Sequence, residues 1–346
     1  MKEYYKNLNE KIKNYFKILE PDFPEWLNEY INTKELLKQQ YISVTCGTIY
    51  SKLFESDFFF SSLDHSVGVA LIVWHFTHDK KQTLAGLFHD IATPAFKHCI
   101  DFLYGDYMKQ ESTEDLTTKI IKSPKEITQL LKRDHIDICE IDNYHLYPIA
   151  DNDTPKLSSD RLEYSLSNAL FIYRMVELKD IKEIYDDIEI QKNEDNKDEL
   201  GFKTKKIADK FVKITSKLSI YYREDRTRYS MQLISDILKL LIEDNKISIK
   251  DLYELKEADV IKIIENSKYK DIFNIWKNAK KIKISKERPE NVYYIHHGAK
   301  IRYIDPLFNN ERISKVCKRA KQMIENNLSY DMGNYVYLDS INLKNY

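Results

Sequence analysis

The chain has 346 residues, a length that suits one large domain or two of moderate size. Its 54 lysines and arginines almost balance its 55 acidic residues, so a net charge of −1 gives no electrostatic argument for binding nucleic acid or a membrane surface. With only seven glycines and eight prolines, the composition favours long helices over turn-rich sandwiches and barrels.

The first hundred residues favour helices. Residues 1–40 have a helical pattern that is broken near Pro21 and Pro24. Residues 41–50 suit a short strand or an extended segment, and residues 63–105 return to a helical pattern. The longest apolar run in this part, VGVALIVW, is too short to span a bilayer.

The middle of the chain alternates helices with polar connections. Residues 106–133 suit one or two amphipathic helices with Pro124 near a start, and residues 134–157 suit a loop with a short helix. A strong helical pattern follows over 158–177, with a serine at 158 or 159 as its N-cap.

The last part begins with a charged run at 190–200, which predicts an exposed loop or hairpin tip. Helices are expected from 204 to about 283, and the run REDRTR within them (223–228) is typical of a solvated face, although an arginine from it could reach phosphates. Residues 291–308 alternate as a strand, and 311–327 suit a final helix. We therefore expect a mostly α fold with a small α+β C-terminal appendage.

These elements suggest three parts: N-terminal helices (1–40), a helical core (41–285) and a strand-helix appendage (286–346). The cysteines form no CxxC pair, which argues against a zinc knuckle; they are Cys46, Cys99, Cys139 and Cys317. The N-terminus has no apolar signal-peptide core, so we expect reduced thiols, a cytoplasmic location and no membrane partner.

Four metal-binding side chains stand at helix ends or first turns behind apolar runs: His65, His89, Asp90 and Asp160. Apolar residues anchor the backbone at such places and leave the polar side chain facing a cleft. Taken singly, a histidine on an apolar face is usually a core residue, and Asp160 also suits a helix N-cap. The case for a metal site therefore depends on their combination.

That combination, H then HD then D, resembles the HD-domain phosphohydrolase superfamily. It is closest to the branch of bacterial deoxyguanosine triphosphohydrolases and animal sterile-alpha-motif and HD-domain dNTP triphosphohydrolases. The segment DHSVGVALIVW is similar to the H-S-x-G-V helix of that branch. AGLFHDIATPAFKHCID is similar to its L-x-H-D-x-G-H-x-P-F-x-H-x-x-D stretch, and SSDRLEY to its D-x-D-R-x-D-Y segment.

The resemblance implies an HD-domain helical bundle that hydrolyses a phosphorylated small molecule, with a nucleotide such as a dNTP as the first choice. It implies that His65, His89, Asp90 and Asp160 bind one divalent ion, which would be Mn²⁺, Fe²⁺, Mg²⁺, Zn²⁺ or Ni²⁺. His98 with Asp101 would carry protons, because their i, i+3 spacing places both on one helix face. Arg161 and Tyr164 would contact phosphate and sugar.

Three positions depart from the pattern of that branch. Ser62 stands where an arginine is usual, Thr93 replaces a second histidine, and Thr113 begins what is usually a His-Glu pair. The acidic residues Glu111 and Glu114 can share a helix face there and act as proton carriers, or they can form an ordinary acidic first turn. These changes weaken the case for a dNTP as the substrate.

Two other functions stay open. A dinuclear iron oxygenase of the HD type would need more ligands, which His98, His135 or His145 could provide. A non-catalytic nucleotide-sensing module would keep the fold and bind a ligand without turnover. The remaining histidines suit structural roles, and the tyrosine-rich C-terminal segment is a candidate surface for a homo-oligomer; these histidines are His75, His78, His296 and His297.

Overall fold

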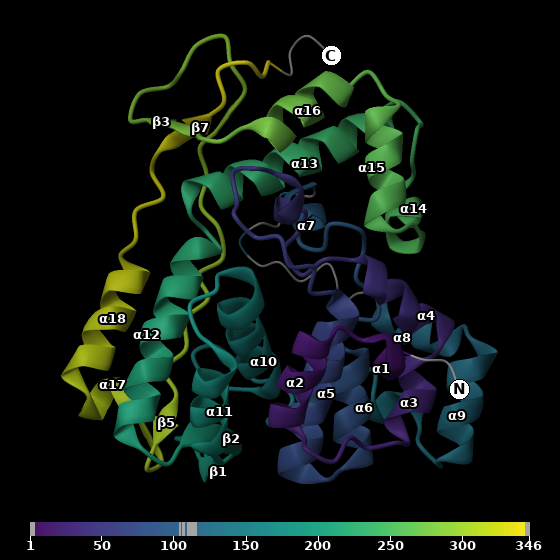
Figure 1. Ribbon diagram of the computed structural model, residues 1–346, viewed down its shortest axis with the longest axis vertical. Coiled ribbons are helices and arrows are strands. Elements are labelled where there is room, and N and C mark those ends of the chain that lie inside the picture. Colours follow the sequence, from purple (N-terminus) through teal and green to yellow (C-terminus); the bar gives the residue numbers. More distant parts are fainter. Residues whose placement is uncertain (1–3, 104, 106–107, 109–115, 343–346) are drawn as a thin grey trace.

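The computed structural model describes residues 4–103, 105, 108 and 116–342, and it confirms a mostly α fold with a small α+β C-terminal part (Figure 1). The α-helices are α1 (Tyr4–Asn7), α2 (Glu10–Leu19), α3 (Leu27–Ile31), α4 (Lys34–Lys38), α5 (Ser62–Thr77), α6 (Lys80–Phe88), α7 (Cys99–Leu103), α8 (Thr117–Lys122), α9 (Lys125–Arg133), α10 (Ser159–Ser167), α11 (Leu178–Asp186), α12 (Lys205–Tyr221), α13 (Asp225–Glu243), α14 (Ile249–Glu254), α15 (Glu257–Glu265), α16 (Lys270–Asn278), α17 (Ile313–Val316) and α18 (Lys318–Leu328).

Helix α5 is the central element of the larger core. A capping box between Ser61 and Asp64 starts it, and His78 in a left-handed conformation ends it. Its residues from Ser62 to Val73 are all buried, because α2, α6 and α10 pack around it. A helix that is apolar on all sides is stable only in such a position.

Two large apolar clusters stabilise the fold. The larger joins the N-terminal helices, α5, α6, α10 and α12, and it also includes Ile304, Ile313 and Ile324 of the C-terminal segment. The smaller surrounds α13, which lies across α7 at the top of Figure 1 with α14–α16 beside it. The three sequence parts therefore share their cores.

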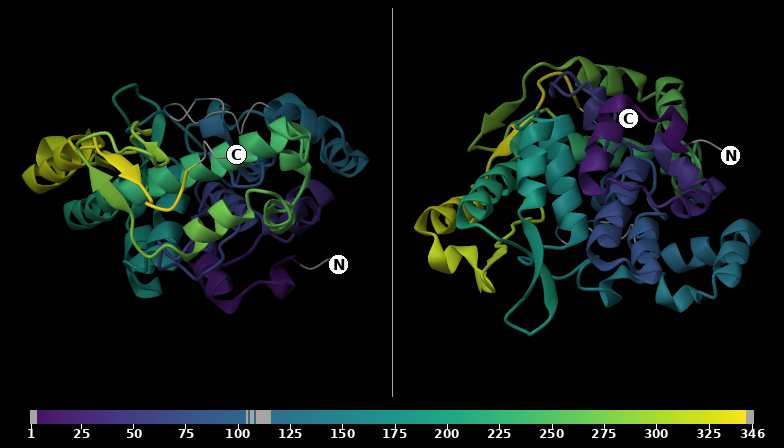
Figure 2. Two further views of the ribbon diagram at one scale, coloured as in Figure 1. Left: turned by 90° about the horizontal axis from the view of Figure 1, so that it is seen from above. Right: turned by 60° about the horizontal axis from the view of Figure 1, so that its bottom comes forward.

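The C-terminal segment runs down the molecule and back again (Figure 1). At the bottom, β5 (Leu307–Phe308) pairs in parallel with β2 (Asp198–Phe202) of a hairpin whose other strand is β1 (Ile188–Lys192), and β6 (Glu311–Arg312) completes the sheet. At the top, β7 (Tyr335–Tyr337) pairs with β3 (Lys283–Ser285) and β4 (Tyr294–Ile295). The β1–β2 hairpin, expected from the charged run, projects from the helical body in the right-hand view of Figure 2.

Two of the expected helices and strands are shorter in the structure. The helix expected over 158–177 stops at Ile172, because a π-helical turn (Asn168–Ile172) follows α10; its cap is Ser158. The strand expected over 291–308 is confined to β4 and β5, since the chain between them crosses from one sheet to the other.

The charged run at 223–228 is not a solvated face. Arg223 and Arg228 are almost completely buried, and their guanidinium groups donate hydrogen bonds to the backbone carbonyls of Asn327 and His297 in the C-terminal segment that covers them. These arginines fasten that segment to α12 and α13. The four cysteines are free thiols, and among the described residues no helix has the length and apolar character needed to cross a bilayer.

Candidate metal centre

Three of the four predicted metal-binding residues meet at one point. His65 lies in the first turn of α5, His89 directly follows α6, and Asp160 lies in the first turn of α10. Nε2 of His65 is 3.2 Å from Nε2 of His89 and 3.1 Å from Oδ1 of Asp160, and the last two atoms are 3.6 Å apart. Such a group of donors, all within 4.8 Å of one another, can hold a metal ion.

Contacts on the far side of each ring orient the two histidines. Nδ1 of His89 donates a hydrogen bond to the backbone carbonyl of Gly86 (2.7 Å). Nδ1 of His65 faces Oε2 of Glu163 at 2.5 Å, and this carboxylate also accepts hydrogen bonds from Tyr15 and Ser167. Both Nε2 atoms therefore point to the centre, which is the arrangement found in carboxylate–histidine–metal sites.

The electrostatics of the group suit a cation. Burial lowers the pKa of His65, but the carboxylates of Glu163 and Asp160 outweigh this effect and raise it to about 10. Burial favours the neutral form of Asp160, yet its contact with His65 holds the pKa of this carboxyl below its usual range. A divalent ion can replace the proton that His65 and Asp160 share, so the residues present fit the expected metal.

The fourth predicted ligand, Asp90, lies beside this group but is paired with another cation. Lys97 donates a hydrogen bond from Nζ to Oδ2 of Asp90 at 2.6 Å, and this oxygen is 3.8 Å from Nε2 of His89. Burial opposes ionisation of Asp90, but Lys97 and the two histidines hold its pKa well below the usual range. Asp90 is therefore an ionised neighbour of the three converging donors.

The two residues predicted to carry protons, His98 and Asp101, contact each other. Nδ1 of His98 lies 2.9 Å from Oδ2 of Asp101, at the start of α7. Asp101 is completely buried, whereas about a quarter of the His98 side chain is exposed. His98 also lines the cavity that contains the metal centre, so its Nε2 can face a ligand there.

That cavity has a volume of about 850 Å³ and contains both predicted substrate-binding residues, Arg161 and Tyr164. The guanidinium of Arg161 is held by Asn152, whose Oδ1 accepts a hydrogen bond of 2.8 Å. Basic residues from four segments of the chain also line it; they are Lys97, Lys156, Lys197, Lys300 and Arg302. Four aspartates line the cavity as well, so basic side chains are in moderate excess, which suits a negatively charged small molecule.

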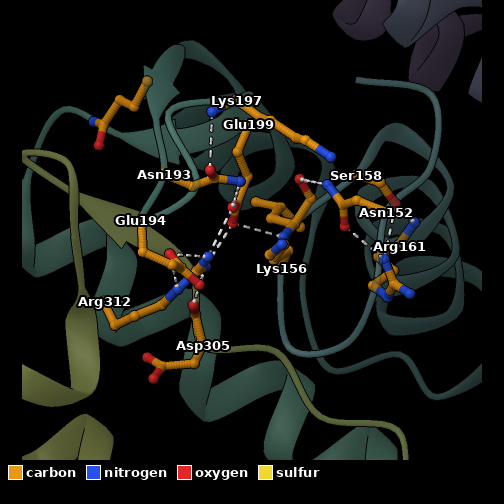
Figure 3. A network of polar contacts seen from close by, with 12 residues as sticks. Asn152, Lys156, Ser158, Arg161, Asn193, Glu194, Lys197, Glu199, Asp305 and Arg312 are labelled. Atoms are coloured by element: carbon orange, nitrogen blue, oxygen red, sulfur yellow. Dashed lines mark hydrogen bonds and ion pairs between the residues drawn. The ribbon is translucent and has the colours of Figure 1, made fainter. Parts of the chain in front are cut away.

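A polar network fastens the outer wall of the cavity (Figure 3). At its centre, the buried carboxylate of Glu199 accepts hydrogen bonds from the guanidinium of Arg312 and from Nδ2 of Asn193. It also accepts one from the backbone N–H of Leu157, in the loop that leads into α10 (3.0 Å). Glu199 thus joins the hairpin and the C-terminal segment to the helix that carries Asp160.

The structure describes two of the three positions that depart from the HD-domain pattern. The hydroxyl of Ser62 accepts a hydrogen bond of 3.4 Å from Nζ of Lys97. The hydroxyl of Thr93 is buried and has no hydrogen-bond partner among the described residues. Thr113, Glu111 and Glu114 lie outside the described residues.

The remaining histidines fall into two groups. His145 lines the cavity and pairs with Asp151 (2.9 Å), whereas His135 is not among the cavity-lining residues. The others take the structural roles expected of them: His75 pairs with Glu20, His78 ends α5, His296 stacks on Tyr335, and His297 packs against Phe102.

The sequence did not reveal two residues of the centre. Glu163 had a usable signal, because it lies three residues after Asp160 on one helix and therefore shares its face. Lys97 had none, since its contact with Asp90 depends on the turn between them.

No known protein-family model matches the chain. The uncharacterized protein YdhJ of Bacillus subtilis (strain 168) is 23% identical over 284 residues, which cover 76% of this chain and 79% of YdhJ. The crystal structure of a hypothetical protein from Aquifex aeolicus matches with a TM-score of 0.62 and 16% sequence identity, over 92% of this chain and 93% of that one. At this identity the likeness concerns the fold alone, which the two chains share over almost their whole length.

Proposed function

We propose that this protein is a metal-dependent phosphohydrolase that acts on a nucleotide or another phosphorylated small molecule. The observation that supports the proposal is the convergence of His65, His89 and Asp160 on one point in the wall of a basic cavity. Two imidazoles and a carboxylate suit Mn²⁺, Fe²⁺, Zn²⁺ or Ni²⁺, with Mg²⁺ as a harder alternative. A bound divalent ion supplies a Lewis acid for a phosphoryl oxygen.

The residues of the chain would divide the remaining tasks among them. His98 lies in the cavity and can transfer a proton to the leaving oxygen, while buried Asp101 fixes the orientation of its ring. Arg161 offers positive charge for phosphate oxygens, because guanidinium groups match phosphate geometry. Tyr164 lies one helical turn from Asp160, where the organic part of a substrate would contact it.

The size and lining of the cavity favour a substrate larger than a simple phosphate. A volume of about 850 Å³ lies within the range of cavities that hold nucleotides and similar small molecules. Its aromatic wall includes Tyr164, Tyr173 and Tyr222, which a planar base would contact. The specific choice of a dNTP depends only on the resemblance in sequence.

The proposal is tested by measuring the release of phosphate, pyrophosphate and tripolyphosphate from dNTPs, NTPs and phosphomonoesters, with Mn²⁺, Mg²⁺, Fe²⁺ or Ni²⁺ present. We expect release by the wild type and none by Asp160→Ala. Asp186→Ala is the matched control, because this exposed aspartate at the end of α11 lies outside the cavity and the group of metal donors and should keep the activity. A folded, metal-loaded wild type that releases nothing would contradict the proposal and favour a sensing module.

A further inference from the structure

Lys97 reaches the metal centre from a strained backbone turn. Phe96 and Lys97 have φ angles of 64° and 45°, and two consecutive residues other than glycine rarely adopt this left-handed conformation. The backbone N–H of Phe96 donates a hydrogen bond to the buried carboxyl of Glu257 (3.2 Å), and its ring packs against Gly47. Strain of this kind persists only where the surroundings enforce it and is frequent at functional sites.

The turn directs the lysine ammonium to one carboxylate. Lys97 is 6% exposed, and its Nζ is 2.6 Å from Oδ2 of Asp90. That oxygen is 3.8 Å from Nε2 of His89, so the carboxylate borders the three converging donors. The hydroxyl of Ser62 lies 3.4 Å from the same Nζ and offers the ammonium a second partner.

We propose that Lys97 sets the affinity of this centre for divalent cations, because its ammonium competes with the ion for the carboxylate of Asp90. An ion that approaches His65, His89 and Asp160 meets a fixed positive charge and a carboxylate that is already paired. Both effects oppose binding in a buried, poorly screened site. The proposal rests on the metal centre of the proposed function but not on its reaction.

A purely structural role for the ion pair makes the opposite prediction. If Lys97 only maintained the fold around Asp90, its loss would loosen the centre and weaken metal binding. If it competes with the ion, its loss leaves Asp90 as an unpaired carboxylate beside the donors, and a divalent ion becomes the partner that this carboxylate lacks. The sign of the change in affinity therefore distinguishes the two roles.

The experiment is equilibrium dialysis of the metal-free protein against Mn²⁺. We expect Lys97→Met to bind Mn²⁺ at least about tenfold more tightly than the wild type, and Lys97→Arg, which keeps the charge, to stay within about threefold of it. Lys97→Gln keeps a hydrogen-bond donor for Asp90 without the charge, so it should also bind Mn²⁺ more tightly than the wild type. It replaces Lys97→Met in the experiment if Lys97→Met does not fold. The matched control is Lys38→Met, because Lys38 is a half-buried lysine that donates to the carbonyl of Thr93, shortly before the turn, and should leave the affinity unchanged.

The outcomes separate this proposal from the metal centre itself. If the wild type binds Mn²⁺ and Asp160→Ala does not, the metal centre exists. In that case, Mn²⁺ binding by folded Lys97→Met or Lys97→Gln that is equal to or weaker than that of the wild type overturns the role of Lys97. Absence of Mn²⁺ binding by the wild type and by the neutral variants overturns both the centre and the role of Lys97.

Discussion

The carboxylate of Glu163 lies 2.5 Å from Nδ1 of His65, on the side of the ring that faces away from the metal centre. Glu163 is completely buried and raises the basicity of the imidazole that would bind the ion. We expect Glu163→Gln to weaken Mn²⁺ binding by about 10-fold to 100-fold, measured by equilibrium dialysis. Ser167→Ala removes only a hydroxyl that donates to the same carboxylate at 3.2 Å, and it should change the affinity little. An affinity of Glu163→Gln equal to the wild type would disprove this role.

Gly68 provides the space that Glu163 occupies. A Cβ at this position would lie 2.7 Å from Cγ and 2.8 Å from Oε1 of Glu163, which has no room to move. Gly68→Ala should therefore lower the free energy of unfolding by about 1–3 kcal/mol and also weaken Mn²⁺ binding. Urea unfolding and dialysis measure the two effects. Gly298→Ala, where a Cβ would meet only ordinary contacts at 3.7 Å, should show neither.

Asp101 orients His98, so it should affect the chemical step more than substrate binding. Asp101→Asn keeps a side chain of the same shape but removes the charge beside Nδ1 of His98. We expect kcat to fall by about a hundredfold with little change in KM, because general acid–base catalysis contributes at this scale. Steady-state hydrolysis of the best substrate provides both constants. A fall confined to KM would show that the pair binds substrate instead.

Glu257 makes the stability depend on pH. Burial raises its pKa to about 7, although hydrogen bonds from Tyr50 and the backbone of Phe96 oppose this. The folded protein therefore binds the proton more tightly than the unfolded chain, whose glutamates titrate near 4.5. The stabilisation from this bound proton is fully present below about pH 4.5 and is lost as the pH rises to about 7. Its loss lowers the free energy of unfolding by up to about 3 kcal/mol.

Glu257→Gln lacks this titration but keeps an acceptor for Phe96. Compared with the wild type, it should gain stability steadily between about pH 5 and pH 7, and the gain should level off above about pH 7. Urea unfolding of both proteins at intervals of one pH unit measures the difference. A difference that does not change with pH would show that Glu257 does not titrate in this range.

The buried ion pair between Glu199 and Arg312 should contribute strongly to the fold at the outer wall (Figure 3). Glu199→Gln leaves Arg312 buried without its main partner and should cost about 3 kcal/mol of unfolding free energy. Glu194→Gln removes the other carboxylate on Arg312, which is half exposed, and should cost under about 1 kcal/mol. Hydrogen exchange at Leu157, whose N–H donates to Glu199, should increase in Glu199→Gln alone.

The sequence by itself determined the helical character of the chain and the spacing of its metal donors. The mostly α fold was predicted from the scarcity of glycine and proline and from the helical periodicity. Periodicity is informative because apolar residues recur in every turn on the buried face of a helix. The same reasoning located His65, His89 and Asp160 at helix ends, where a polar side chain can face a cavity.

Only the tertiary structure decided which side chains meet. Lys97 pairs with Asp90 in a segment where Phe96 and Lys97 are left-handed, and periodicity in the sequence does not predict such a conformation. Arg223 and Arg228 look like solvated residues locally, but the returning C-terminal segment buries them by offering carbonyl oxygens. Burial of this kind depends on contacts between residues about 70 to 100 positions apart, which local sequence patterns do not contain.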